Sequence, residues 1–160
     1  MIETLERSHR PIPAYLRIIE QEESDRLRLA HFAQPCFWVG EAELGQIDGV
    51  VATQAAFMGG HEVTSVWFDP NDVSLLDLSR QAQQRNVAST VFTDSDGLEE
   101  LRGSGVSAKE IDEGSHRVAP RSDQKRQLRG ARGLGDLSIS QLTKLNAFAH
   151  RDIDLSLIHI

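Results

Sequence analysis

The chain has 160 residues, enough for one domain, and its hydrophobic content of 39% and charged content of 26% are close to ordinary globular values. Its net charge of −7 argues against nucleic-acid binding, and no stretch is long and apolar enough to span a membrane. One cysteine excludes an internal disulfide in this chain, and the first residues contain no apolar signal core. We therefore expect a cytoplasmic protein with no membrane partner.

The chain is expected to begin with an N-terminal arm, residues 1–25. Pro11 and Pro13 exclude a continuous helix through the arm, while residues 14–23 suit one or two helical turns that pack on the domain. Residues 26–33 have apolar side chains at alternate positions, which predicts a strand.

The only cysteine, Cys36, follows this strand at the start of a predicted helix. Trp38, Glu41, Ala42 and Gly45 lie three and four residues apart, which is helical spacing. The first amides of a helix have no internal partner and the helix dipole favours negative charge there, so a thiol at this position forms the reactive thiolate more readily. The alternative is a buried, inert cysteine that packs as a small apolar side chain.

Five further elements are predicted before residue 103. They are strands at residues 50–57, 62–68 and 87–93, and helices at residues 74–84 and 98–102. Gly59 and Gly60 favour a hairpin between the first two strands, and Asp72 or Ser74 caps the first of the two helices. The resulting order predicts an α+β fold of the ferredoxin-like split βαββαβ type, with an antiparallel sheet and helices on one face.

Residues 1–102 are therefore predicted to form one domain with its arm, followed by an irregular C-terminal extension at residues 103–154. Glycine, lysine and arginine recur in residues 103–135, and we interpret this basic segment as a solvated tail because no aromatic side chains are interleaved for base stacking. Residues 138–148 predict a short helix. Residues 155–160 resemble a translated sequencing adapter and are treated as a non-native tail.

Several segments, in the same order along the chain, resemble motifs of the A-type peptide methionine sulfoxide reductase family. Cys36-Phe37-Trp38-Val39-Gly40-Glu41 is similar to the family motif GCFWxxE. The other matches are residues 48–53 with pGVxxT, residues 57–60 with GYxGG, residues 61–70 with HaEvvxVxyDP and residues 89–96 with IFxxsdeQ. The resemblance implies a divergent, shortened member of this family with the same ferredoxin-like fold.

The resemblance also implies a reaction. Cys36 would attack the sulfur of (S)-methionine sulfoxide as the single nucleophile, and Glu62 would act as the acid beside the sulfoxide oxygen. The implied substrate-binding residues are Phe37, Trp38, Glu41 and Phe57. The sulfenic acid formed on Cys36 would be reduced by an external thiol, either thioredoxin or a small thiol, with no bound cofactor and no metal.

Departures from the family pattern leave two other hypotheses open. Pro35 stands in place of the motif glycine, Phe57 in place of a tyrosine, and Val87 where the family has a second tyrosine. The first alternative is therefore a catalytically degenerate relative that serves as a thiol redox sensor or a methyl-thioether binding module. The second is an unrelated interaction domain whose contact surface is the basic segment.

Overall fold

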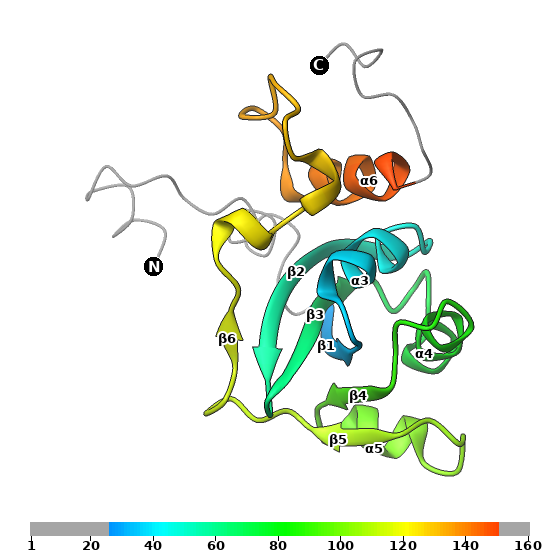
Figure 1. The fold of residues 1–160 in the computed structure, drawn as a ribbon. Helices are drawn as coiled ribbons and strands as arrows, with labels where there is room; N and C mark the ends of the chain where they lie inside the picture. Colours follow the sequence, from blue (N-terminus) through cyan, green and yellow to red (C-terminus); the bar gives the residue numbers. More distant parts are fainter. Residues whose placement is uncertain (1–25, 151–160) are drawn as a thin grey trace.

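The computed structural model describes residues 26–150, so the predictions for residues 1–25 and 155–160 lie outside it. In this part of the chain six strands form one sheet in the order β5-β4-β1-β3-β2-β6 (Figure 1). The strands are β1 (Arg28–Ala33), β2 (Val50–Met58), β3 (His61–Phe68), β4 (Thr90–Thr93), β5 (Ala108–Glu110) and β6 (Arg117–Val118). The helices are α3 (Phe37–Leu44), α4 (Leu75–Gln84), α5 (Ser95–Leu101) and α6 (Ile139–Ala149), with 3-10 turns η1 (Arg121–Asp123) and η2 (Arg126–Leu128). The predicted α+β class is confirmed.

The prediction of a wholly antiparallel sheet is wrong, because the sheet is mixed. Strands β4, β1, β3 and β2 lie next to one another in that order, and each neighbouring pair is antiparallel. Strand β5, however, pairs in parallel with β4. Helix α5 connects these two strands and returns the chain to the same end of the sheet, which is how parallel neighbours are joined.

The prediction of an irregular extension after residue 102 is also corrected. Strand β5 extends one edge of the sheet, and β6 pairs antiparallel with β2 at the opposite edge. The chain between them crosses from one edge to the other (Figure 1). Residues 108–110 and 117–118 of the basic segment are therefore part of the sheet rather than of a solvated tail.

The predicted hairpin joins β2 to β3 through Gly59 and Gly60. Their φ angles are 58° and 80°, and a tight two-residue turn requires this left-handed conformation, which glycine adopts without steric cost. The turn fixes the register so that Phe57 lies opposite Glu62. The hairpin thereby places an aromatic ring next to a carboxylate on neighbouring strands.

The main apolar core lies between one face of the sheet and helices α3, α4 and α5. Its buried members include Leu44 of α3, Leu75 and Leu78 of α4, Leu101 of α5, and Ala30, Phe32, Val66 and Phe68 of the sheet. A second cluster holds Ala33, Ala56, Met58, Val63 and Phe92, with Ile111 packed against it. Alternate residues of the strands belong to the two clusters, so the second cluster lies on the face of the sheet opposite the helices. Ile111, the residue directly after β5, packs against that face. None of the helices in residues 26–150 has the length and apolar character needed to cross a membrane.

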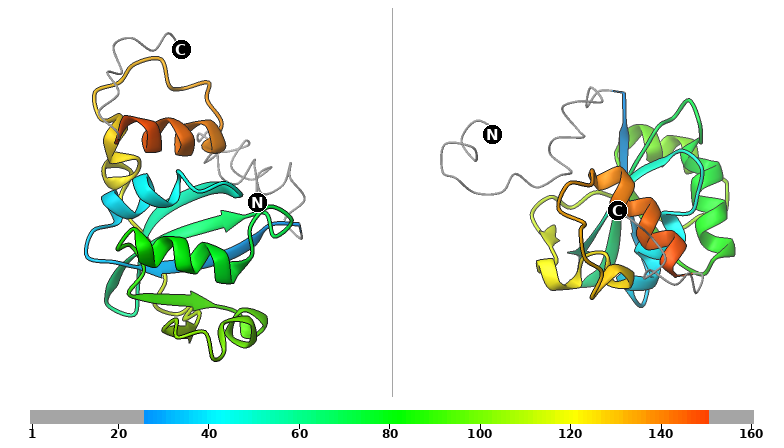
Figure 2. Two further views of the ribbon diagram at one scale, coloured as in Figure 1. Left: turned by 90° about the vertical axis from the view of Figure 1, so that its right-hand side faces the viewer. Right: turned by 90° about the horizontal axis from the view of Figure 1, so that it is seen from above.

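Helix α6 lies next to α3, on the side away from α5 (Figure 2). It starts with a capping box at Ser138. Lys144 Nζ donates to the carbonyl oxygens of Gly45 at 2.7 Å and Ile47 at 3.1 Å, just after the last residue of α3. Burial lowers the pKa of Lys144, while the nearby Asp48 carboxylate opposes that shift. These contacts hold the C-terminal end of α3 in place.

Candidate active site

Cys36 is the N-cap residue of α3, one position before the first turn in which the sequence placed it. Its backbone is extended, with φ −145° and ψ 112°, and its carbonyl oxygen accepts a hydrogen bond from Gly40 N at 3.0 Å. The cysteine is free and partly exposed. The sulfur therefore belongs to a residue at the start of the helix, where amide groups lack internal partners, and reagents can reach it.

Glu62 accepts hydrogen bonds from one residue before Cys36 and from one residue after it. Its carboxylate Oε1 accepts a hydrogen bond from Phe37 N at 3.2 Å, and its main-chain oxygen accepts one from Gln34 N at 3.2 Å. Phe37 directly follows Cys36, so the Glu62 carboxylate lies at the same helix start as the thiol. Because these bonds link β3 to the helix, they fix the position of an acidic group beside the candidate nucleophile.

A cavity of about 220 Å³ opens at this point. Its lining consists of Cys36, Phe37, Trp38, Phe57, Glu62 and Asp123. The Phe37 ring meets the Phe57 ring edge to face, with centroids 5.4 Å apart, and its centroid lies 6.4 Å from that of Trp38. The structure thus brings together all the predicted site residues except Glu41. Three aromatic rings supply apolar walls, and one thiol and two carboxyl groups supply the reactive and polar groups.

Two arginines stack on the aromatic walls. Arg117 Cζ lies 4.9 Å from the centroid of the Phe57 ring, and Arg126 Cζ lies 4.5 Å from that of Trp38. Guanidinium groups at such distances are attracted by the negative faces of the rings. Both arginines come from residues 117–126, which we call the wall segment. Part of the predicted basic segment therefore packs against the cavity walls.

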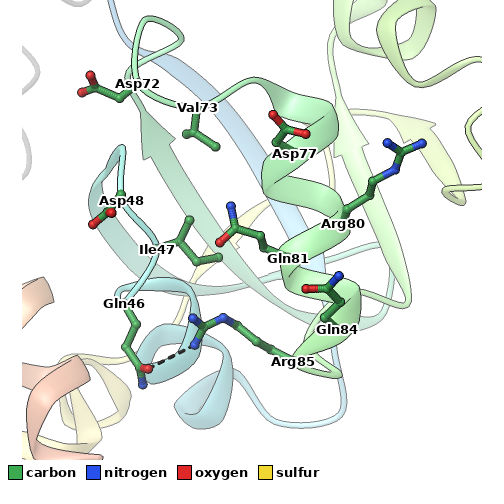
Figure 3. Close-up of a pocket in the computed structure, with 10 residues that line it drawn as sticks. All are labelled: Gln46, Ile47, Asp48, Asp72, Val73, Asp77, Arg80, Gln81, Gln84 and Arg85. Carbon is green, nitrogen blue, oxygen red and sulfur yellow. Dashed lines mark hydrogen bonds between the residues drawn. The ribbon is translucent and has the colours of Figure 1, made fainter.

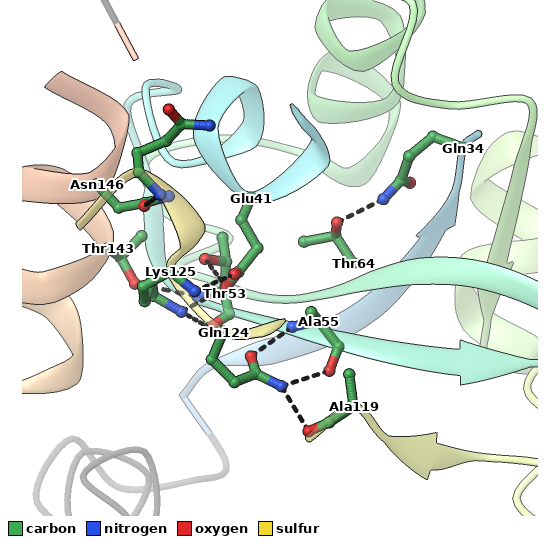
Figure 4. Close-up of polar contacts among 11 residues, drawn as sticks. Gln34, Glu41, Thr53, Ala55, Thr64, Ala119, Gln124, Lys125, Thr143 and Asn146 are labelled. Atoms are coloured by element: carbon green, nitrogen blue, oxygen red, sulfur yellow. Dashed lines mark hydrogen bonds and ion pairs between the residues drawn. The ribbon is translucent and has the colours of Figure 1, made fainter. Parts of the chain in front are cut away.

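Glu41 lies outside the cavity lining, which does not support its predicted contact with substrate. Its side chain is fully buried. Oε1 accepts from the Thr53 hydroxyl at 3.0 Å and from the Lys125 ammonium group, and Oε2 accepts from Lys125 N at 2.7 Å (Figure 4). Lys125 Nζ also donates to Thr53 O at 2.6 Å. Glu41 therefore joins α3 to the wall segment as one partner of a buried ion pair.

The wall segment is also fastened to the edge of β2. Gln124 Oε1 accepts from Ala55 N at 2.8 Å, and its Nε2 donates to Ala55 O at 2.8 Å and to Ala119 O at 3.0 Å (Figure 4). The side chain thereby continues the hydrogen-bonding pattern of the strand edge beyond β6. Asp123 directly precedes Gln124 and Lys125, so these two anchors hold it at the cavity.

Asp123 is the one lining residue that the sequence did not predict. It belonged to the segment interpreted as a solvated tail, and no spacing pattern links it to Cys36. Its position depends on the neighbouring Gln124 and Lys125, whose anchoring roles can be recognised only once their partners on β2 and α3 are known.

A larger open hollow of about 500 Å³ lies elsewhere, between the chain at residues 46–48 and helix α4 (Figure 3). Carboxylates and guanidinium groups dominate it, and Arg85 Nη1 donates to Gln46 Oε1 at 3.1 Å. No cysteine or histidine lines it in the part of the chain that the structure describes. Among the described residues, no group of three or more His, Cys, Asp or Glu side chains could hold a metal ion. The cavity at Cys36 is therefore the candidate active site.

No family model matches the chain. The chain is 37% identical over 76 residues to a peptide methionine sulfoxide reductase of Geobacter metallireducens, in a match covering 37% of this chain and 47% of that protein. It is 36% identical over 70 residues to the enzyme of the same name from Methanothermobacter thermautotrophicus, covering 33% of this chain and 41% of that protein. The matched part thus spans under half the length of these relatives.

The solved structure of methionine sulfoxide reductase A from Corynebacterium diphtheriae is similar in fold. It superposes with a TM-score of 0.52 at 16% identity, covering 68% of this chain and 77% of that one. Fold and cavity together define an α+β protein with a partly exposed cysteine at a helix start, between aromatic rings and a carboxylate. Part of the chain is thus similar in sequence to peptide methionine sulfoxide reductases, and its fold is similar to that of one solved member.

Proposed function

We propose that this protein reduces (S)-methionine sulfoxide, with Cys36 as its single nucleophile and an external thiol as the reductant. The observation that carries the proposal is the cavity in which Cys36, Glu62 and three aromatic rings meet. The names of the related proteins, both peptide methionine sulfoxide reductases, support the same activity.

In the first step the Cys36 thiolate attacks the sulfoxide sulfur. The attack forms a transient bond between the two sulfur atoms. That bond and the S–O bond of the substrate both break as the oxygen is transferred to Cys36 as a sulfenic acid, and methionine leaves. Two electrons pass from the cysteine sulfur to the substrate sulfur. The oxygen needs a proton as negative charge develops on it, and Glu62 is the acidic group held at the same helix start as Cys36.

The aromatic walls suit the methyl group of the substrate. Methyl groups next to sulfur are apolar and pack well against aromatic rings. Phe37 and Phe57 make an edge-to-face pair, and Trp38 completes the apolar part of the lining. A methyl group between these rings would direct the sulfoxide sulfur toward Cys36.

Regeneration of the thiol requires two external thiol groups, which come from two molecules of a small monothiol or from one molecule of a dithiol. The first condenses with the sulfenic acid, which releases water and leaves a mixed disulfide on Cys36. The second attacks that disulfide, which frees Cys36 and releases the oxidised reductant. Because the chain has one cysteine, no second thiol of this chain can replace either external thiol group.

One feature favours a second function, thiol redox sensing without turnover. Among residues 26–150, no side chain that lines the cavity carries a hydroxyl group, and position 57 is phenylalanine. Proton donation to the sulfoxide oxygen would then depend on carboxyl groups alone. A sensor would need only the reactive thiol and the apolar cage.

A single-turnover experiment separates the two functions. The protein is mixed with N-acetyl-methionine sulfoxide without reductant, and the N-acetyl-methionine released is counted by chromatography. A reductase with one cysteine releases about one equivalent per chain, then stops until dithiothreitol is added. A sensor forms sulfenic acid with hydrogen peroxide but releases no N-acetyl-methionine. Cys36→Ser is the control, and release by this variant would contradict the proposed nucleophile.

A further inference from the structure

The two arginines that stack on the cavity walls lie against the walls but do not line the cavity. Arg117 pairs with Phe57 across the edge of β2, and its guanidinium group lies over the Phe57 ring. The guanidinium group of Arg126 lies in the same way over Trp38. Both rings line the cavity at Cys36, whereas the two arginines are not among the residues that line it. Two positive charges therefore flank the cavity from outside.

Neither of these guanidinium groups has a hydrogen-bond or ion-pair partner in the part of the chain that the structure describes. The chain nevertheless has 24 acidic residues against 17 basic ones, and both Arg28 and Arg85 form an ion pair with a glutamate. Ring stacking uses the flat face of a guanidinium group, while its five N–H donors lie in the plane. Arg117 and Arg126 therefore keep donors that an anion can accept.

The backbone at both positions is held in place. Arg126 directly follows Lys125, whose ammonium group lies in the buried ion pair, and Gln127 N donates to Asn146 Oδ1 of α6 at 2.9 Å. The other arginine is held by the pairing of β6 with β2. A guanidinium group that is already stacked and positioned loses less side-chain entropy when it pairs with an anion, so the pairing is more favourable.

The inside of the cavity has the opposite electrostatic character. Its acidic groups are the carboxyl groups of Glu62 and Asp123. A further carboxylate placed among them would lose solvation and meet groups of like charge. A ligand that suits the site therefore places an uncharged group against the rings inside the cavity and carries its negative charges outside, beside the two arginines.

We propose that Arg117 and Arg126 are specificity residues that select, among peptides containing methionine sulfoxide, those with aspartate or glutamate within two residues of the oxidised methionine. The uncharged sulfoxide side chain enters the cavity, and the carboxylates of the neighbouring residues pair with the guanidinium groups outside it. Arginine suits this role because its planar donors match the two oxygens of a carboxylate. This inference rests on the proposed function for the identity of the reacting group.

The test compares blocked pentapeptides that share a central methionine sulfoxide and carry only glutamate, only glutamine or only lysine at the flanking positions. Binding is measured by NMR titration of the full chain carrying Cys36→Ser, so that no turnover interferes. The glutamate peptide is expected to bind about tenfold more tightly than the glutamine peptide at low salt, and the lysine peptide more weakly than either, since each exposed ion pair contributes about threefold. Salt at about 0.5 M should remove most of these differences.

Substitutions separate a charge effect from a structural one. Arg117→Gln and Arg126→Gln should each weaken binding of the glutamate peptide about threefold and leave the glutamine peptide unchanged. The double variant Arg117→Glu with Arg126→Glu should bind the lysine peptide most tightly, a reversal that a purely structural role would not produce. Arg129→Gln is the matched control, because Arg129 is exposed and only three residues after Arg126. It should keep the preference of the parent chain.

Equal binding of the three peptides, or no binding of any of them, would overturn the inference. Equal weakening of all three peptides by Arg117→Gln and Arg126→Gln would assign the arginines a structural role and overturn it as well, as would an equal loss of preference in Arg129→Gln. A preference for the glutamate peptide in a chain that reduces no sulfoxide would refute the proposed reductase activity and leave the charge selection in place. Reduction of N-acetyl-methionine sulfoxide without any charge preference would do the reverse.

Discussion

The buried ion pair between Glu41 and Lys125 gives the sharpest test of how the site is built, through Lys125→Met. The change removes the ammonium group but keeps a long unbranched side chain. Lys125 is 9% exposed and Glu41 is 0% exposed, so water cannot replace the lost partner. The Glu41 carboxylate would keep the Thr53 hydroxyl and the Lys125 amide but lose its counter-charge.

Removing one partner of a buried pair costs about 3–5 kcal/mol, because an uncompensated charge remains inside the protein. With a denaturant slope of about 2 kcal/mol per molar urea, the unfolding midpoint should fall by about 2 M. The thermal midpoint should fall by roughly 6–20 °C. The assay is urea unfolding at neutral pH, followed by tryptophan fluorescence. Lys109→Met, the same change at an exposed position, should remain within about 0.5 kcal/mol of the parent protein.

The double variant Glu41→Gln with Lys125→Met removes both charges while leaving an amide oxygen for the Thr53 hydroxyl. Its stability loss should be smaller than the sum of the two single losses by about 1–3 kcal/mol, since residues in contact are not additive. Additive losses, or a Lys125→Met midpoint no lower than that of Lys109→Met, would refute the assignment of this pair as the anchor of the wall segment.

Three further outcomes are expected. Iodoacetamide should label Cys36 in the folded protein because the residue is partly exposed, and labelling only after unfolding would make it a packing residue. Glu62→Gln should lower the rate of sulfoxide reduction by roughly 10²–10⁴, and an unchanged rate would remove the acid role. Burial, aided by His116, lowers the pKa of His31 from 6.5 to about 4. Between pH 6.5 and pH 4 the unfolded chain therefore binds a proton at His31 that the folded chain does not bind. As the pH falls through this range, the free energy of unfolding should decrease by about 3 kcal/mol. Replacing His31 with glutamine should flatten that slope in urea unfolding, and an unchanged slope would assign it to other groups.

The elements that the sequence predicted well are those with local signals. The hairpin follows from two adjacent glycines, each with φ above 50°. The start of α4 follows from Ser74, whose hydroxyl accepts from Asp77 N three residues later. Cys36 was correctly placed at a strand-to-helix turn because periodicity changes within a few residues on either side. In each case the chemistry that decides the structure lies within four or five residues of the chain.

The features that the sequence did not predict depend on partners far along the chain. Strands β5 and β6 are three and two residues long, too short to show alternation. Lys125 lies in a basic segment, and its partner Glu41 is 84 residues away. The predicted helical position of Glu41 was correct. Helical spacing alone, however, cannot distinguish a carboxylate that lines the cavity from one that is buried in an ion pair. Only the assembled sheet brings the wall segment to α3.

Two separate parts of the chain therefore line the cavity. The thiol, Glu62 and the rings belong to α3 and the hairpin, while Asp123 belongs to the wall segment. Gln124 fastens that segment to β2 and none of its side-chain hydrogen bonds reaches α3. Gln124→Ala should leave the Ala55 amide without its partner, at a cost of about 1–3 kcal/mol, and loosen the segment that carries Asp123.

Alkylation of Cys36 by iodoacetamide should proceed at the same rate in Gln124→Ala as in the parent protein, because the start of α3 keeps its bonds to Glu62. The KM for N-acetyl-methionine sulfoxide should rise, because the wall segment contributes Asp123 to the cavity lining and stacks Arg117 and Arg126 on two of its rings. If alkylation slowed in step with the rise in KM, thiol reactivity would itself depend on the wall segment, and the cavity would have to be treated as one cooperative unit.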